Sequence, residues 1–302
     1  MLTGRLTSGK RRAANRNRTA ARNCAAHSCS MDGPLDKPHL FSQQDMTQGE
    51  IHSLGCGTAA VFSTRCPGKE SVNEDAAALV PFGDDAAVLM VADGLGGHMA
   101  GERASRLAIE KVRDAVQNIT KNGAELRDAI LNGIETANAT VAELSGDAAT
   151  TLAVVEIQGP LVRPYHVGDS VILLVGNRGK IKLQTISHSP VAYAVEAGWL
   201  DEQEAMHHEE RHLISNIIGS PGMRIEIGPS LKMAPRDTLV VASDGLADNL
   251  HVHEIVERVR KGPLRQASNR IAQDALQRMH APTPDHPSKA DDLTFIAYRL
   301  KR

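Results

Sequence analysis

Short apolar runs broken by glycine, proline and acidic residues are the feature that most limits how this chain can fold. Each run has six to eight residues, the usual length of a buried strand, and is bounded by residues typical of turns. We therefore predict strands at 58–64, 76–82, 86–92, 151–157, 161–167, 170–175, 180–186, 238–245 and 293–300.

Helical patterns occur in only a few places between these runs. Apolar residues spaced by three and four positions mark two consecutive amphipathic helices, from Ala104 to Ile119 and from Leu126 to Leu144. Further helices are predicted at 194–210 and 264–279. Because strands are many and helices are few and grouped, we predict an α+β fold of packed sheets with helices outside them.

The first 50 residues differ from the rest of the chain. They are rich in Arg, Asn and Ser and lack an apolar period, so we predict a disordered basic tail at 1–50 and one domain at 51–302. The first 30 residues also resemble a mitochondrial presequence. Met31 and Met46 are alternative starts if the gene start is over-long.

Charge is divided unevenly along the chain. Residues 1–31 hold seven basic side chains and no acid, which leaves 27 basic and 36 acidic groups for residues 32–302. An acidic body argues against nucleic acid as a partner and suits a protein that gathers carboxylates for cations. The four cysteines form no paired metal motif, and we find no signal sequence or membrane span, so we expect a cytoplasmic protein.

Acidic residues stand at the ends of five predicted strands. Two of them, Asp93 and Asp244, are followed by glycine, and an Asp-Gly pair by itself is also typical of a hairpin turn. Gathered carboxylates repel one another unless cations neutralise them, and hard divalent ions such as Mg²⁺ or Mn²⁺ prefer oxygen ligands. Metal binding and turn formation both remain open from the residues alone. The other acidic points are 73–75, Asp169 and 291–292.

Six motifs, taken together, resemble the metal-dependent protein phosphatase family of type 2C. They are NEDA at 73–76, VADGLGGHMAGERAS at 91–105, TTL at 150–152, VGDS at 167–170, ASDGL at 242–246 and DDLT at 291–294. The resemblance covers about residues 55–300. It implies a four-layer sandwich, in which two packed antiparallel β-sheets are flanked by helix pairs.

The resemblance also implies the ligands of two Mn²⁺ or Mg²⁺ ions. Asp93 would bridge both ions, Asp244 and Asp291 would bind the first, and Glu74 and the carbonyl of Gly94 would bind the second. A bridging hydroxide would attack phosphorus directly, so that Asp93 has a catalytic role. His98 is a candidate general acid for the leaving oxygen, and a structural or surface histidine is the alternative.

Two positions depart from the family pattern. Where the family has a phosphate-binding arginine, this chain has Glu70, and we favour the neighbouring Lys69 over Arg65 as its substitute. Ser187 stands where relatives have an aspartate that some bacterial members use at a third metal. Asp147 is the candidate ligand for a third ion, and a solvent-exposed loop acid is the alternative interpretation.

The leading functional hypothesis is a phosphatase that acts on phosphoserine and phosphothreonine. Its partners would be phosphorylated proteins, it would counteract a Ser/Thr kinase, and we expect a monomer. The alternatives are a non-catalytic phosphatase-like binding module and a hydrolase of small phosphoesters. Residues 187–230 resemble the family's flap, and their histidines lack the spacing of a zinc motif.

Overall fold

The computed structural model describes residues 35–96, 99–122, 125–145, 147–201, 204–205, 208–283 and 286–301. The chain divides into two units, Met1–Ser30 and Met31–Arg302. The first unit lies outside the described residues, so the architecture below is that of the second.

The first large sheet is antiparallel throughout and follows the order β1-β4-β5-β8-β9-β12, with β13 also paired to β9. Its central strands are continuous runs of buried aliphatic residues, as a strand covered on both faces requires. Its strands are β1 His39–Ser42, β4 Ala76–Phe82, β5 Ala86–Ala92, β8 Leu152–Gln158, β9 Leu161–Val167, β12 Glu226–Ile227 and β13 Leu231–Lys232.

The second large sheet, also antiparallel, follows the order β11-β10-β14-β15-β3-β2. A small third sheet pairs β6 (Gly94–Leu95) with β7 (Ala149–Thr150), next to the end of β5. The strands of the second sheet are β2 Glu50–Leu54, β3 Gly57–Thr64, β10 Val171–Val175, β11 Ile181–Gln184, β14 Thr238–Ala242 and β15 Leu293–Leu300.

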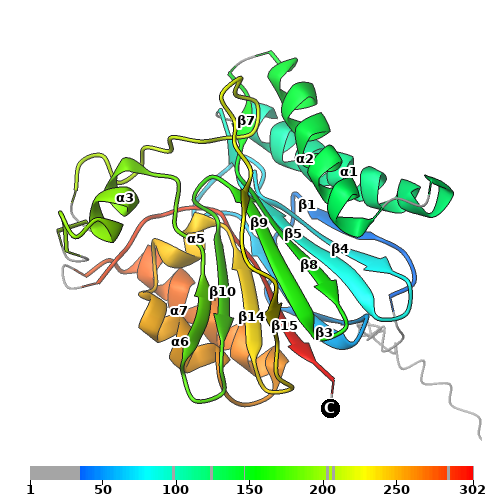
Figure 1. Cartoon of the computed structure of the whole chain (residues 1–302). Helices are drawn as coiled ribbons and strands as arrows, with labels where there is room; N and C mark the ends of the chain where they lie inside the picture. Colours follow the sequence, from blue (N-terminus) through cyan, green and yellow to red (C-terminus); the bar gives the residue numbers. More distant parts are fainter. Residues whose placement is uncertain are drawn as a thin grey trace, which may run out of the picture. The chain divides into compact units, whose positions relative to one another are not determined.

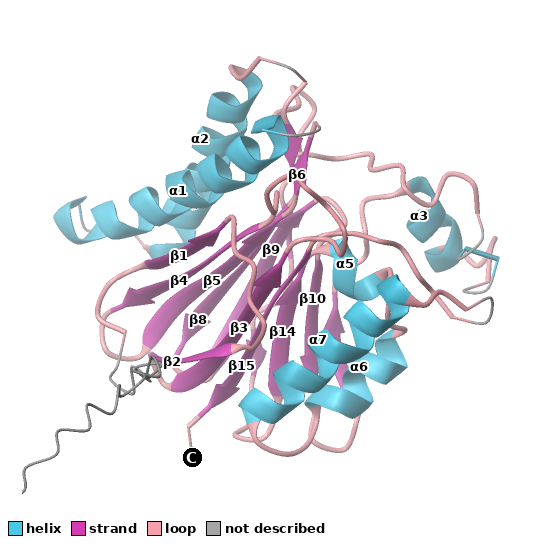
Figure 2. Cartoon of the chain, turned by 180° about the vertical axis from the view of Figure 1, so that it is seen from behind, coloured by secondary structure: helices cyan, strands magenta, loops and turns pink. Residues whose placement is uncertain are grey.

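Helices cover the outer face of each sheet (Figures 1 and 2). The pair α1 (Met99–Asn122) and α2 (Leu126–Ala142) packs on the first sheet, and α6 (Val252–Val259) and α7 (Leu264–His280) pack on the second. Two short helices, α3 (Pro190–Glu196) and α5 (Asp244–Ala247), lie in the connections. This arrangement confirms the predicted α+β sandwich of four layers.

Alternation along the strands explains the layers. In β4, Ala76, Ala78 and Val80 belong to the core cluster under α1 and α2, whereas Ala77 and Leu79 belong to the cluster between the two sheets. The same division occurs in the second sheet, since Val241 faces the other sheet and the next buried positions face α6 and α7. Side chains of period two thus fill three successive core layers.

Two predictions about order and helix length need correction. The predicted tail at 1–50 includes β1, whose Phe41 is buried between the sheets, so the ordered body begins before residue 51. The helix predicted at 194–210 is not continuous, because α3 ends at Glu196 and Gly198 follows with a φ of +72°, whereas residues 194–196 and 204–205 are helical. Among the described residues, we find no helix with the length and apolarity needed to span a membrane.

Candidate metal centre

Strand pairing brings the acidic strand ends to one edge of the sandwich. Ala76 pairs with Ala92, so Asp75 and Asp93, which lie just outside these two residues, are neighbours. In the second sheet Ala242 pairs with both Val171 and Phe295. The residues just beyond those strand ends, namely Asp169, Asp244, Asp291 and Asp292, therefore gather at the same place.

Burial and mutual repulsion change the acidity of these groups. Burial raises the pKa of Asp93 well above its usual range, and the charges of Asp75, Asp244 and Asp291 raise it further. Burial and the charge of Asp292 likewise raise the pKa of Asp75. Burial, with Asp244 and Asp248, raises the pKa of Asp169 to about 8. Crowded, desolvated carboxylates of this kind are typical of functional sites.

Two lysines neutralise part of this charge. The Lys289 ammonium lies 2.7 Å from Asp244, 2.8 Å from Asp291 and 3.1 Å from Asp248. Burial lowers the pKa of Lys289, but the charges of these three carboxylates outweigh it and the net pKa is raised.

Lys69 bridges a different pair of acids, Glu74 and Asp292. Its ammonium lies 2.7 Å from Glu74 and 2.6 Å from Asp292. Burial opposes the charged form, yet hydrogen bonds to the two carboxylates raise the pKa of Lys69 overall. Both lysines are therefore cations held among carboxylates.

The glycines of the two Asp-Gly pairs are required by close backbone packing. A Cβ on Gly94 would lie 2.2 Å from the carbonyl oxygen of Gly101 and 2.7 Å from that of Glu74. A Cβ on Gly245 would lie 2.0 Å from the carbonyl oxygen of Asp292. A Cβ on Gly101 would in turn lie 2.7 Å from the Gly94 carbonyl oxygen and 2.8 Å from Glu74 Oε1, so these two oxygens both lie next to Gly101. The absence of side chains lets the backbone segments pack this closely.

Several carboxylate oxygens at this edge are buried without a hydrogen-bond partner. They belong to Glu74, Asp75, Asp169 and Asp244. A buried oxygen left unpaired is costly, and a hard divalent cation is the partner that such oxygens best accommodate. The donor set therefore fits Mn²⁺ or Mg²⁺.

The backbone of Asp93 is fixed by two threonines. The Asp93 amide donates to Thr151 Oγ1 at 3.0 Å, and the Asp93 carbonyl accepts from the Thr151 amide at 2.9 Å and from Thr150 Oγ1 at 2.7 Å. Thr151 Oγ1 also bonds to Ser170 Oγ at 2.7 Å. The TTL motif thus holds the aspartate at the end of β5 in a defined position.

The sequence-predicted residues are placed as follows. Asp93, Gly94, Glu74, Asp244, Asp291 and Lys69 lie together, with Lys69 already paired to two acids. Asp147 is exposed, with a left-handed φ of +51°, and it stays only a prediction as a ligand of a third ion. His98 lies outside the described residues. Sequence reasoning did not single out Lys289 or Asp248, because the contacts of Lys289 with Asp244 and Asp248 join residues that are distant in the sequence.

Comparison with known proteins decides the family. Residues 64–280, more than half of the chain, match the family model described as protein phosphatase 2C. The chain belongs to the protein phosphatase 2C family. This confirms the family resemblance, and the chain is an enzyme, a protein-serine/threonine phosphatase.

Relatives of the chain are bacterial phosphatases of this family. The protein phosphatase PhpP of Streptococcus pneumoniae serotype 2 is 32% identical over 177 residues, which are 56% of this chain and 70% of that protein. The structure of serine/threonine phosphatase Stp1 from Staphylococcus aureus has a TM-score of 0.69 and 26% identity, covering 82% of this chain and 97% of that one.

A further solved structure shares the fold. It is the catalytic domain of the phosphatase PstP in complex with two manganese ions, with a TM-score of 0.62 and 24% identity over 81% of this chain and 98% of that chain. At this identity the likeness speaks for the fold. Dependence on divalent metal follows from membership of the protein phosphatase 2C family and from the carboxylate cluster.

Proposed function

We propose that the acidic edge holds two divalent ions, Mn²⁺ or Mg²⁺, and hydrolyses phosphoserine and phosphothreonine in proteins. The observation that carries the proposal is the cluster of buried carboxylate oxygens without hydrogen-bond partners around Asp93. Asp93 would bridge the ions, Asp244 and Asp291 would hold the first, and Glu74 with the Gly94 carbonyl would hold the second. When bound, such ions activate a water for in-line attack on phosphorus and stabilise the charge that develops on the phosphoryl oxygens.

The residues of this chain would orient the reaction rather than form a covalent intermediate. Thr150 and Thr151 keep Asp93 fixed through its backbone, so that its carboxylate does not need to reorganise. We assign binding of the substrate phosphate to Lys69, which would act as a point charge without the forked geometry of arginine. His98 stays the candidate for protonating the leaving oxygen.

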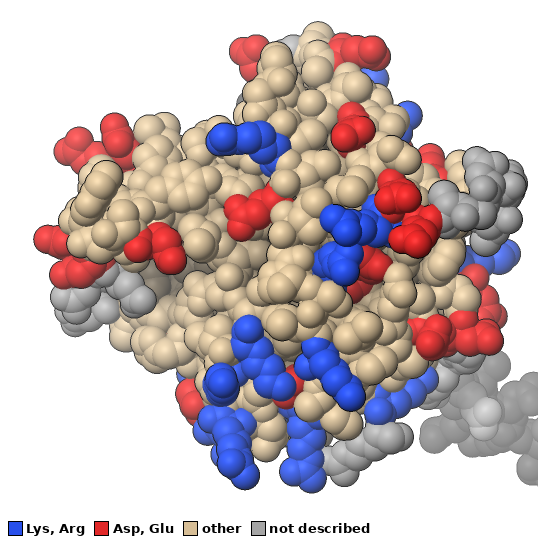
Figure 3. Space-filling view, viewed as in Figure 1, with Lys and Arg blue, Asp and Glu red and all other residues tan. Residues whose placement is uncertain are grey.

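The charge of the flap favours some protein substrates over others. Acidic side chains gather on the face of the molecule around α3 (Figure 3). The surface of the flap, residues 187–230, is therefore negative, and we expect it to favour phosphopeptides with basic flanking residues. The exposed acids of this segment among the described residues include Glu196, Asp201, Glu204, Glu209 and Glu210.

Hydrolysis assays on two substrates test the proposal. We expect Mn²⁺-dependent turnover of a phosphothreonine peptide, its loss in EDTA, and a fall in kcat of at least about a thousandfold in Asp93→Asn. Because Asp93 is crowded by other carboxylates, Asp93→Asn should not lower the melting temperature of the metal-free protein. The matched control is Asp114→Asn, an exposed acid of α1 with an ordinary ion pair to Arg113.

The same assay separates the alternative functions. If neither the peptide nor p-nitrophenyl phosphate is turned over with Mn²⁺, the chain is a phosphatase-like binding module. If only p-nitrophenyl phosphate is turned over, the chain is a hydrolase of small phosphoesters. If the phosphothreonine peptide is turned over, the opposing kinase is to be sought among proteins that phosphorylate that peptide.

A further inference from the structure

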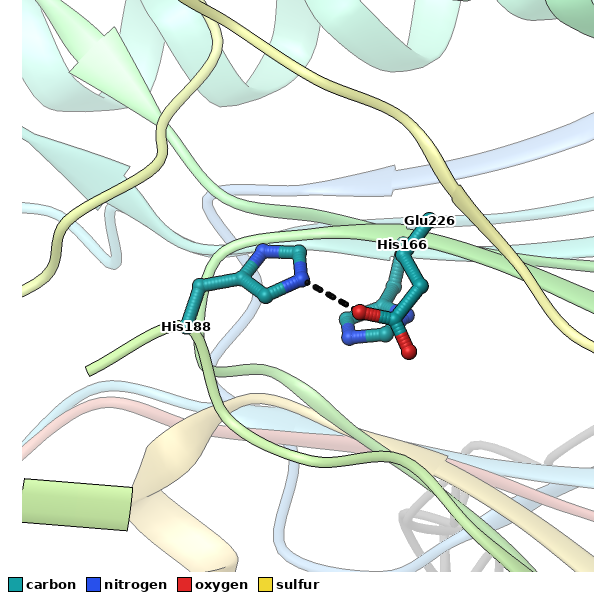
Figure 4. Close-up of side chains that lie close together, drawn as sticks. All are labelled: His166, His188 and Glu226. Carbon is teal, nitrogen blue, oxygen red and sulfur yellow. Dashed lines mark hydrogen bonds and ion pairs between the residues drawn. The ribbon is translucent and has the colours of Figure 1, made fainter. Parts of the chain in front are cut away.

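His166, His188 and Glu226 form a second cluster of titratable side chains (Figure 4). Their candidate ligand atoms lie within 4.8 Å of one another. The two histidines are buried and their rings are stacked, with centroids 4.4 Å apart, whereas the Glu226 side chain is half exposed. Two histidines and one carboxylate would also be a common ligand set for zinc.

Hydrogen bonds argue against metal binding by His188. Its Nδ1 accepts from the Gly168 amide at 3.0 Å and from Asn216 Nδ2 at 2.9 Å. The orientation of the Asn216 amide is fixed, because its Nδ2 donates to the Arg224 carbonyl and its Oδ1 accepts from the Arg224 amide. Nδ1 of His188 is therefore the acceptor nitrogen, Nε2 carries the proton, and that proton is donated to Glu226 at 3.1 Å.

His188 joins the two ends of the flap to the turn that carries Asp169. Its backbone amide donates to the Gly168 carbonyl at 3.0 Å, in addition to the bond from Gly168 to its ring. Its carbonyl accepts from the amide and the hydroxyl of Ser215. Glu226, in β12, lies at the far end of the flap. The turn before the flap and two separate parts of the flap therefore meet at His188.

The turn held by His188 leads to the metal centre by a continuous path. Gly168 has a φ of +105°, and a Cβ there would lie 2.7 Å from Thr151. The next residue, Asp169, carries one of the unpartnered carboxylate oxygens. Ser170 then bonds to Thr151 Oγ1, which accepts from the Asp93 amide.

We propose that His188 is a positioning residue. Its Nδ1 fixes the Gly168 peptide, and thereby sets the Asp169 carboxylate and, through Ser170 and Thr151, the backbone of Asp93. Glu226 supports this by accepting the Nε2 proton, which keeps Nδ1 free as an acceptor. The proposal rests on the proposed function, because it assigns His188 a role toward the two metal ions.

Two substitutions of His188 test the roles of its two ring nitrogens separately. In His188→Asn, Oδ1 replaces the Nδ1 acceptor and the donor to Glu226 is lost. In His188→Gln, the side-chain amide replaces the Nε2 donor and the acceptor for Gly168 is lost. We expect calorimetric Mn²⁺ affinity to fall about tenfold in His188→Gln and less than about threefold in His188→Asn. A purely structural role would lower the melting temperature of both variants and leave the Mn²⁺ affinity of both unchanged.

A matched pair elsewhere serves as the control. His52 is also buried and lies 3.4 Å from a half-exposed carboxylate, that of Glu50, on an edge strand of the other sheet. We expect Glu226→Ala to weaken Mn²⁺ binding about threefold and Glu50→Ala to leave it unchanged. Equal Mn²⁺ affinities in these two variants would contradict the role of Glu226.

Amide exchange without metal keeps this inference separate from the proposed function. In His188→Gln we expect faster exchange at Gly168 and Asp93 than in His188→Asn, and unchanged exchange at Asp93 in both would overturn the inference. Wild-type protein that binds no Mn²⁺ would refute the proposed function instead, and the role of His188 toward the ions with it. A stoichiometric Zn²⁺ site that is lost in Glu226→Ala would overturn the assignment of the Nε2 proton.

Discussion

Two lysines lie among acids at the same edge of the sandwich, but their surroundings differ. The Lys289 cluster consists of Lys289 with Asp244, Asp248 and Asp291, and the Lys69 cluster consists of Lys69 with Glu74 and Asp292. Lys289 contacts Asp244 and Asp291, the two carboxylates that we assign to the first ion alone. Lys69 contacts one proposed ligand of the second ion and one acid that we assign to neither.

The difference shows in how the acids are held. Asp292 accepts from the amides of Cys66 and Glu74 as well as from Lys69, so its charge is satisfied by the chain itself. Asp244 keeps one buried oxygen without a partner even with Lys289 present. We infer that the Lys289 ammonium takes the place of a metal cation in the metal-free protein. The Lys69 ammonium instead neutralises Asp292, an acid with a structural role, and we propose that Lys69 also binds the substrate phosphate.

Among the changes to the two lysine clusters, removal of the Lys289 charge should have the largest effect, and that effect is on Mn²⁺ affinity. In Lys289→Met, the first ion no longer has to displace an ammonium or overcome its repulsion, so we expect calorimetric Mn²⁺ affinity to rise about tenfold. The metal-free protein loses the partner of three carboxylates, and its melting temperature in EDTA should fall by at least about 3 °C. These two changes have opposite signs, and differential scanning calorimetry with and without Mn²⁺ measures both.

The control for Lys289 is another lysine paired to a buried acid. Lys182 bonds to Asp237 outside the metal centre, with an exposure similar to that of Lys289. Lys182→Met should lower the melting temperature and leave Mn²⁺ affinity unchanged. Weaker Mn²⁺ binding in Lys289→Met would show that Lys289 supports the site rather than competing for it.

The Lys69 cluster predicts a smaller effect, and on substrate rather than on metal. We expect Lys69→Ala to raise KM for a phosphothreonine peptide about fivefold, because one charge near the phosphate is lost. Its neighbour Glu70 is exposed and of the opposite sign, so Glu70→Ala should leave KM unchanged or lower it. Steady-state kinetics at saturating Mn²⁺ compares them, and equal effects would contradict a phosphate-binding role for Lys69.

Local pattern was sufficient for much of the fold. The bounds predicted for β4, β5, β9 and β15 are those observed, because each strand has acids, glycine or proline directly beside it on at least one side. β1 was missed, since only Phe41 of its four residues is buried and pairing with β4 is what makes it a strand. The helix predicted at 194–210 ignored Gly198, whose left-handed backbone follows the end of α3.

Site residues that belong to sequence motifs could be predicted, whereas residues that reach the site through contacts with distant segments could not. Asp93, Asp244 and Asp291 stand next to strand ends, so their sequence position already places them at the sheet edge. Lys289 and His188 have no such signal, because Lys289 contacts Asp244 across 45 positions and His188 contacts Gly168 across 20. Such contacts depend on which distant segments the fold brings together, and neither residue stands in a motif that marks this.

The smallest effect is expected from Asp292→Asn, which removes one negative charge from the Lys69 cluster. Of the two carboxylates in the cluster, Lys69 then keeps only Glu74 as a charged partner. Its attraction to the substrate phosphate is less neutralised, and KM for the phosphopeptide should fall about twofold. The asparagine amide cannot accept from both backbone amides that Asp292 binds, so the melting temperature should also fall. The decisive measurement is a double-mutant cycle, because the fall in KM should vanish when Lys69→Ala is present. If KM falls equally in both backgrounds, Asp292 acts on the phosphate directly by repulsion, and Lys69 does not mediate its effect on substrate binding.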